Sequence, residues 1–241
     1  MFKGTVLCVQ RNAAMRYAAT FLSDLGICVT GRCAPDVTHL LLPVPSFSGG
    51  DEYLAHTLTE LPDYVIVSGG YLSSPLLEGY ACVDFLRDPF YLAENAAITA
   101  RCAVEILEKH IGSGFAGKRA LVIGWGRIGK CLVPLLQRKN TGVTVVARKE
   151  TDLAMTRALG CRSIHVADAA DETERYDLIL NTVPTLLFPN IRAKSEAVLL
   201  ELASKPGMTG PNIIDGRGLP GKMAPDQSGK LIAETFIRLS I

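Results

Sequence analysis

The sequence predicts an α/β protein with two Rossmann-like α/β domains, each built on a parallel sheet. A long spine helix is expected to join the domains, and a C-terminal helix is expected to return to the first one. Three observations support this fold class. Short β-branched runs alternate with helical stretches, which is typical of parallel sheets. The segment 90–110 is rich in alanine and lacks proline and glycine, so it predicts one long helix. A glycine motif at 124–129 lies between a strand-like and a helix-like run.

The expected domain boundaries follow these segments. We expect an N-terminal α/β domain on the substrate side over 1–88, a linking helix over 89–113, an NAD(P)-binding Rossmann domain over 114–225 and a C-terminal helix over 226–241. The first domain should contain strands at 5–9, 27–30, 39–42, 64–67 and 81–85, and helices at 13–25, 52–61 and 71–78. The second should contain strands at 120–123, 143–146, 162–165, 176–181, 197–202 and 212–215, helices at 130–139 and 151–159, a loop at 216–222 and a closing helix at 228–239.

Composition narrows the class of protein. Of the 241 residues, 48% are hydrophobic and 20% are charged, and the formal net charge is +1. Such a balance gives a globular core and no reason to expect a nucleic-acid or membrane surface. No apolar run has the length of a transmembrane helix, and the chain starts directly with a strand-like run instead of a signal peptide. The seven cysteines are scattered without a C-x-x-C motif, so we expect reduced thiols, a cytoplasmic location and no metal site.

The glycine motif predicts a dinucleotide site. Gly124 would allow a tight turn after the strand, Gly126 would let a pyrophosphate approach the backbone, and Gly129 would let the helix pack close to the sheet. Amides at the start of the following helix would then face the phosphates, and the helix dipole favours negative charge there. Trp125 lies inside the motif and is a further candidate for cofactor contact. The alternative is a glycine-rich turn without a ligand.

The end of the next strand favours NADP over NAD. An NAD site usually has a carboxylate there for the ribose hydroxyls, whereas this chain reads Ala147-Arg148-Lys149 before its first carboxylate, Glu150. Arg148 and Lys149 are therefore candidates for binding a 2′-phosphate. The alternative is that both cations belong to a solvated loop.

Three further strand ends are rich in glycine, proline and small polar residues: 181–184, 203–207 and 216–221. Ligands of doubly wound sheets bind beyond the carboxyl ends of the strands. A cofactor cleft would explain why all three segments fall on one edge, and ordinary turn chemistry is the alternative.

The order of these motifs resembles the A subunit of dipicolinate synthase. The matching motifs are the glycine motif, Asn181-Thr182-Val183-Pro184, Leu202-Ala203-Ser204-Lys205-Pro206-Gly207, Gly218-Leu219-Pro220-Gly221, Ala224-Pro225 and Ser228-Gly229. The resemblance is specific from about residue 95 to the C-terminus, and its general architecture extends over the whole chain. More loosely, the chain is similar to NAD-dependent 2-hydroxyacid dehydrogenases and adenosylhomocysteinase.

The resemblance implies an oxidoreductase of bacterial sporulation that oxidises a dihydrodipicolinate-type cyclic dicarboxylate, with hydride transfer to NADP or NAD. It also implies a partner, a flavoprotein-like B subunit, and allows a homo-oligomer such as a dimer. By match of motif, the pyrophosphate would contact Gly124, Gly126, Arg127, Ile128 and Gly129. The adenosine and ribose side would be lined by Thr182, Val183 and Pro184. The nicotinamide end would be approached by Ala203, Pro206 and Gly207, and the cleft would be closed by Leu219, Pro220 and Gly221.

Two departures from the family pattern support an alternative function. The first strand of the family ends in a Gly-Gly-Asp-x-Arg-Gln type motif, whereas residues 10–15 read Gln-Arg-Asn-Ala-Ala-Met, with Ala14 in place of the arginine. An arginine is a natural clamp for a carboxylate. A Thr-x-Glu-Gly motif is replaced by Thr99-Ala100-Arg101-Cys102. The alternative is a diverged, non-catalytic dinucleotide-binding subunit with a regulatory or scaffold role.

The candidates for catalysis are few: Asn95, Thr99, Lys222 and Ser228. Asn95 and Thr99 could hydrogen-bond a substrate, Lys222 could bind a carboxylate or relay a proton, and Ser228 could donate from a helix start. Each also has an ordinary structural interpretation, as a helix cap or a solvated side chain. A 2-hydroxyacid dehydrogenase is disfavoured because the segment 215–228 contains no histidine.

Overall fold

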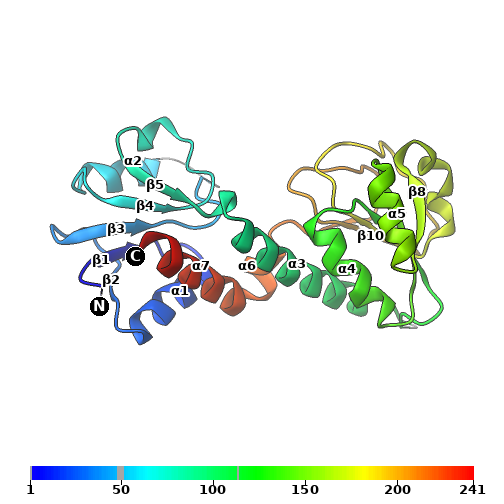
Figure 1. Ribbon diagram of the computed structural model, residues 1–241, viewed down its shortest axis with the longest axis horizontal. Coiled ribbons are helices and arrows are strands. Elements are labelled where there is room, and N and C mark those ends of the chain that lie inside the picture. Colours follow the sequence, from blue (N-terminus) through cyan, green and yellow to red (C-terminus); the bar gives the residue numbers. More distant parts are fainter. Residues whose placement is uncertain (1, 48–51, 113) are drawn as a thin grey trace. The chain divides into compact units, whose positions relative to one another are not determined.

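The computed structural model describes residues 2–47, 52–112 and 114–241, and it divides into two compact units (Figure 1). Unit 1 comprises Met1–Asn95 and Pro220–Ile241, and unit 2 comprises Ala96–Leu219. Each unit is an α/β fold on a parallel sheet, so the predicted fold class is confirmed. The long helix α3 (Pro89–His110) begins in unit 1 and continues into unit 2. Residue 113, the last of the predicted linking segment, lies outside the described residues.

Unit 1 contains a five-stranded parallel sheet in the order β2-β1-β3-β4-β5. Its strands are β1 (Thr5–Cys8), β2 (Cys28–Thr30), β3 (Val37–Leu41), β4 (Ile66–Gly69) and β5 (Ala81–Asp84), and its helices include α1 (Ala13–Asp24) and α2 (Glu52–Thr59). The side chain of Asn12 caps α1 by accepting a hydrogen bond from the amide of Met15, as its residue type predicts. The C-terminal helix α7 (Pro225–Ser240) packs against α1 in this unit, so the predicted return of the chain is confirmed.

In unit 1 one expected helix is wrong, and one expected strand is present with a later start. The helix expected over 71–78 is a loop with one 3-10 turn at Pro75–Leu77, because Tyr71 has a φ of 59° and the Asp84 carboxylate accepts from the amides of Tyr71 and Leu72. The strand expected at 64–67 begins later, at Ile66. Its start is delayed because the amide of Val65 donates to the carbonyl of Pro62 in a turn.

Unit 2 contains a six-stranded parallel sheet in the order β11-β10-β9-β6-β7-β8. Its strands are β6 (Arg119–Ile123), β7 (Gly142–Ala147), β8 (Arg162–His165), β9 (Leu178–Asn181), β10 (Val198–Glu201) and β11 (Ile213–Asp215). Helix α4 (Arg127–Gln137) connects β6 to β7, and α5 (Glu150–Ala158) connects β7 to β8. If the six strands are numbered 1 to 6 along the chain and the sheet is read from β8, the order is 3-2-1-4-5-6. This is the doubly wound arrangement, and its switch point lies between β6 and β9.

Three boundaries near the predicted motifs differ from expectation. Helix α4 begins at Arg127, so the second half of the glycine motif is already helical. The segment expected to be a loop over 216–222 contains the short helix α6 (Leu219–Met223). Helix α7 begins at Pro225 instead of Ser228, because proline suits the first turn of a helix.

Candidate functional site

The glycine loop follows β6 in unit 2. Gly124 has a φ of +105°, a conformation that side-chain-bearing residues rarely adopt, and its amide donates to the carbonyl of Val146 at 2.8 Å. A Cβ at Gly124 would lie 2.5 Å from Oγ1 of Thr182, and a Cβ at Gly129 would lie 2.2 Å from the carbonyl oxygen of Gly124. Both glycines therefore permit close approaches within the protein that any other residue would disrupt.

Gly126 has a different environment. It is exposed, and a Cβ placed on it would meet no described atom within 4 Å. It is also the N-cap of α4 and, having no side chain, leaves the first-turn amides of Arg127, Ile128 and Gly129 to an anion. Open space above a backbone at a helix N-terminus fits a pyrophosphate. The residues present thus fit the cofactor that the motif implies.

The cations predicted for a 2′-phosphate lie directly after β7. Arg148 and Lys149 are exposed, and Lys149 is the N-cap residue of α5. The carbonyl of Arg148 lies 3.2 Å from Nε2 of His165, at the end of the neighbouring strand β8. The backbone of Arg148 is therefore tied to β8, while the residue itself is exposed.

The end of β9 is fastened to the end of β6. Both the amide and the hydroxyl of Thr182 donate to the carbonyl of Ile123 at 2.9 Å, so this hydroxyl is used within the fold. The Asn181 side chain is fully buried and bonds both backbone groups of Val183, accepting from its amide at 3.2 Å and donating to its carbonyl at 3.0 Å. Pro184 follows. The turn after β9 is thus fixed by side chains of its own strand end.

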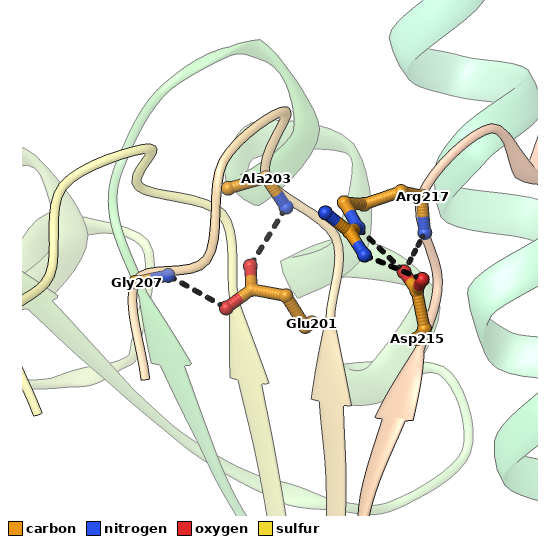
Figure 2. A network of polar contacts seen from close by, with 5 residues as sticks. All are labelled: Glu201, Ala203, Gly207, Asp215 and Arg217. Atoms are coloured by element: carbon orange, nitrogen blue, oxygen red, sulfur yellow. Dashed lines mark hydrogen bonds and ion pairs between the residues drawn. The ribbon is translucent and has the colours of Figure 1, made fainter. Parts of the chain in front are cut away.

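The end of β10 is organised by a buried carboxylate (Figure 2). Glu201 is 4% exposed, and its Oε1 accepts from Nδ2 of Asn181 at 2.7 Å and from the amide of Ala203 at 2.9 Å. Its Oε2 accepts from the amides of Gly207 at 2.8 Å and Met208 at 3.3 Å. The predicted segment 203–207 is therefore a loop folded around one side chain, with Pro206 exposed at its surface.

The end of β11 carries an exposed ion pair, also drawn in Figure 2. The guanidinium of Arg217 donates two hydrogen bonds of 2.8 Å to the two carboxylate oxygens of Asp215, and the Arg217 amide donates a third at 3.0 Å. The hydrogen bond to Asp215 raises the pKa of Arg217 above its ordinary value. Leu219 is buried at the end of unit 2, whereas Pro220 and Gly221 continue α6 into unit 1.

The four candidates for catalysis fall in both units. Thr99 is buried on α3 in unit 2, whereas Asn95, Lys222 and Ser228 belong to unit 1. Asn95 is half-buried and Lys222 is exposed. The expectation that Ser228 stands at a helix start is wrong: it is buried one turn inside α7, and its amide donates to the carbonyl of Ala224.

A cavity of about 550 Å³ adjoins the glycine loop on the side of α4 and α5. Trp125 contributes to its wall together with residues of both helices: Lys130, Val133, Pro134, Gln137, Thr151, Asp152, Met155 and Leu159. Trp125 therefore borders both the glycine loop and a cavity lined by α4 and α5. Among the described residues, no group of three or more histidine, cysteine, aspartate or glutamate side chains could hold a metal ion. No helix within the described ranges is both long and apolar enough to cross a membrane.

Sequence reasoning missed the residues that hold the strand ends together. Asn181 entered only as part of a motif, and Glu201, Asp215 and Arg217 were given no role. For Glu201 one signal exists, since it is the single carboxylate within the apolar run 198–202. A lone acid in such a run is seldom buried without partners.

The doubly wound order, the glycine loop and the polar strand ends at the switch point define a class, the dinucleotide-binding α/β fold of dehydrogenases. Dehydrogenases are indeed among the solved structures with this fold. Within that class the chain is similar to the A subunit of dipicolinate synthase from Bacillus subtilis (strain 168), with 25% identity over 200 residues, 76% of this chain and 67% of the relative.

Solved structures agree in fold. The A subunit of dipicolinate synthase from Bacillus halodurans superposes with a TM-score of 0.84 at 21% identity, covering 98% of this chain and 97% of that one. A transhydrogenase from Sinorhizobium meliloti superposes with a TM-score of 0.73 at 14% identity, covering 98% and 92%. No protein-family model matches the chain. The predicted resemblance to the A subunit of dipicolinate synthase is confirmed.

Proposed function

We propose that this protein is a nicotinamide-dinucleotide-dependent oxidoreductase subunit that binds NADP in preference to NAD. Its proposed substrate is a cyclic dicarboxylate of the dihydrodipicolinate type. The proposal rests chiefly on the loop 124–129, where an exposed, unobstructed Gly126 caps α4 at the carboxyl end of β6. The similarity to the A subunit of dipicolinate synthase supports the substrate class.

The residues of unit 2 have distinct proposed roles in binding. Amides at the start of α4 would bind the pyrophosphate, and the cations Arg148 and Lys149 would bind the 2′-phosphate of NADP. Thr182, Val183 and Pro184 would border the adenosine and ribose side. The loop 203–207 would approach the nicotinamide end, and residues 219–221 would border the cleft.

The proposed reaction requires few catalytic groups from the protein itself. When bound, the nicotinamide supplies the hydride acceptor, and oxidation of the substrate also releases a proton that a base must take. Lys222 is exposed on α6 and is our candidate for binding a substrate carboxylate or relaying that proton. Asn95, Thr99 and Ser228 are candidates for hydrogen bonds to the substrate. The proposed partner is a second, B-type subunit, because the B. subtilis relative is itself one subunit of a synthase.

A thermal-shift titration with NAD, NADP, NADH and NADPH tests the proposal. A ligand at 100 times its dissociation constant stabilises the native state by about 2.7 kcal/mol, which raises the melting temperature measurably. We expect a larger shift with NADPH than with NADH, and loss of that difference in Arg148→Ala. Arg138→Ala is the matched control, because Arg138 is an exposed cation at the opposite end of α4.

Two results would count against the proposal. If no dinucleotide shifts the melting temperature, the glycine loop is not a cofactor site. If NADPH and NADH shift it equally and Arg148→Ala changes neither, the preference for NADP is wrong while dinucleotide binding stands.

One observation favours the alternative, a non-catalytic dinucleotide-binding subunit. Ala14, which takes the place of an arginine in the family pattern, is 4% exposed inside α1, where its carbonyl lies against Gly229 of α7. This position offers no cation for a substrate carboxylate. Turnover assays of the protein with dihydrodipicolinate and a B-type subunit separate the two functions: a change in NADPH absorbance removes the alternative, and binding without turnover supports it.

A further inference from the structure

We propose that Glu201 is a positioning residue that holds the nicotinamide-side loop, residues 203–208, in its binding conformation. The inference deepens the proposed function and rests on it. Glu201 was assigned no role by its sequence pattern, and it need not touch the cofactor. Its proposed role is to fix the backbone against which the nicotinamide half of the cofactor binds.

The contacts of Glu201 reach both neighbouring strand-end segments. One carboxylate oxygen accepts from Asn181, which in turn fixes the turn after β9, and from the amide of Ala203. The other oxygen accepts from the amides of Gly207 and Met208, at the far end of the same loop. As Figure 2 shows, the carboxylate points into this loop and spans its two ends. One side chain therefore sets the spacing between the start and the end of the loop.

The chemistry of the site requires a carboxylate. All four contacts to Glu201 come from N–H donors, so its two oxygens must act as acceptors only. Glutamine keeps the size and reach of the side chain but replaces one oxygen by an NH₂ group. That group would face two N–H donors, and at 4% exposure water cannot relieve the conflict. The loop would have to move in order to avoid it.

The place of the loop in the sheet assigns it to one half of the cofactor. A doubly wound sheet has two mononucleotide-binding halves that meet at the switch point. Here the glycine loop belongs to the half formed by β6, β7 and β8, and Glu201 belongs to the half formed by β9, β10 and β11. Because the glycine-loop half holds the adenosine end, the loop held by Glu201 should act on the nicotinamide end.

Close packing restricts the loop further. A Cβ on Gly207 would lie 2.3 Å from Nδ2 of Asn181 and 2.4 Å from the carbonyl oxygen of Val183. Gly207→Ala would therefore push the loop away from the same network without removing the carboxylate. Two chemically different substitutions should thus have one consequence.

The experiment compares a whole cofactor with its fragment that lacks nicotinamide. Isothermal titration calorimetry gives the dissociation constants of NADPH and 2′-phospho-ADP-ribose, or of NADH and ADP-ribose if the wild type prefers NADH. We expect Glu201→Gln to weaken dinucleotide binding about tenfold, the effect of roughly one unsatisfied buried hydrogen bond, and to weaken fragment binding less than about threefold. Gly207→Ala should give the same selective loss.

Glu196→Gln is the matched control, since Glu196 is an exposed glutamate of the segment that leads into β10. It should bind both probes as the wild type does. A merely structural role of Glu201 would weaken both probes equally in both variants, and that result would overturn the inference while leaving the proposed function intact. Unchanged binding of both probes in both variants would overturn it as well. If the wild type binds neither dinucleotide, the proposed function fails and the inference fails with it. Should Glu201→Gln not fold, Gly207→Ala alone decides between selective and uniform loss.

Discussion

The two units use buried polar side chains for different purposes. In unit 1, Nε2 of His39 lies 3.0 Å from the carbonyl of Ser240, and the hydroxyl of Ser68 lies 2.8 Å from that of Ser240, so both side chains bind the end of α7. In unit 2, the buried side chains of Asn181 and Glu201 bind amides and a carbonyl of the loops after β9 and β10. One sheet uses its polar groups to hold a helix, and the other uses them to hold loops.

The glycines of the two units also differ in role: one in unit 1 lies at a contact between helices, and two in unit 2 lie in a loop. Gly229 of unit 1 permits close contact between two helices, because a Cβ there would lie 2.4 Å from the carbonyl oxygen of Ala14 on α1. Gly124 and Gly126 of unit 2 form a turn with open space above one of them. Sheets of the same kind can therefore differ in what they offer a ligand. In this molecule the difference comes from polar groups and glycines at strand ends, more than from the strands themselves.

The largest expected effect separates two glycines of the same loop. Gly129→Ala would place a Cβ 2.2 Å from the carbonyl oxygen of Gly124, and we expect it to destabilise unit 2 by about 3 kcal/mol through overpacking. Gly126→Ala meets no described atom, so its cost should be about 1 kcal/mol or less, the loss of a good N-cap residue. Urea unfolding followed by the fluorescence of Trp125, the single tryptophan of the chain, measures both.

The effect of the Gly126 substitution should be larger on NADPH binding than on stability. Gly126→Ala stays folded and should lose NADPH binding, because its Cβ would fill the space proposed for the pyrophosphate. Equal stability of the two variants would contradict the contact at Gly129. Unimpaired NADPH binding by Gly126→Ala would contradict a pyrophosphate at this loop.

A smaller effect is expected at Gly229, in unit 1. Gly229→Ala gains about 1 kcal/mol of helix propensity but must separate α1 from α7, so we expect a net loss of about 1–2 kcal/mol. Hydrogen exchange, read separately for peptides of each unit, should show faster exchange in unit 1. Glu234→Ala on the exposed side of α7 is the control. Unchanged protection in unit 1 would mean that the two helices are not held as closely as described.

Much of the fold was predictable because its signals are local. The β-branched runs, the alanine-rich helix and the glycine motif each depend on a few neighbouring residues, and all of them appear near the expected places. The helix α6 was missed because it is short and contains Pro220 and Gly221, two residues with poor helix propensity. At this segment the burial of Leu219 and the start of α7 outweigh the poor helix propensity of the residues.

The candidate site was only half predictable. A glycine motif has a fixed spacing, so its place at a strand end could be deduced from the sequence. The role of Glu201 could not, because three of its four partners are backbone amides, which every residue except proline carries. Nothing in the side chains of Ala203, Gly207 or Met208 marks them as partners of an acid. Only the burial of a lone carboxylate at the end of an apolar strand gave a hint.

The smallest expected effect is a pH dependence confined to unit 1. His39 is 7% exposed, its ring makes edge contacts with Phe2 and Phe236 at 5.1 and 5.6 Å, and this burial lowers its pKa below the usual value. In the unfolded chain, His39 is protonated as the pH falls through an ordinary histidine pKa of about 6.5. In the folded chain, the same side chain is still neutral at that pH. The stability that His39 contributes is present above that pH and is lost as the pH falls towards the lowered pKa of the folded state.

Hydrogen exchange of unit 1 at pH values between about 8 and 5, corrected for the intrinsic exchange rate, measures this loss. His39→Gln keeps an N–H that can reach the carbonyl of Ser240 but cannot be protonated, so its stability should change less over the same range. Comparison at the alkaline end of the range gives the pH-independent cost of the substitution. An equally steep decline in the variant would show that another group causes it. A decline confined to the wild type would mean that the buried ring of His39 destabilises unit 1 once it takes up a proton.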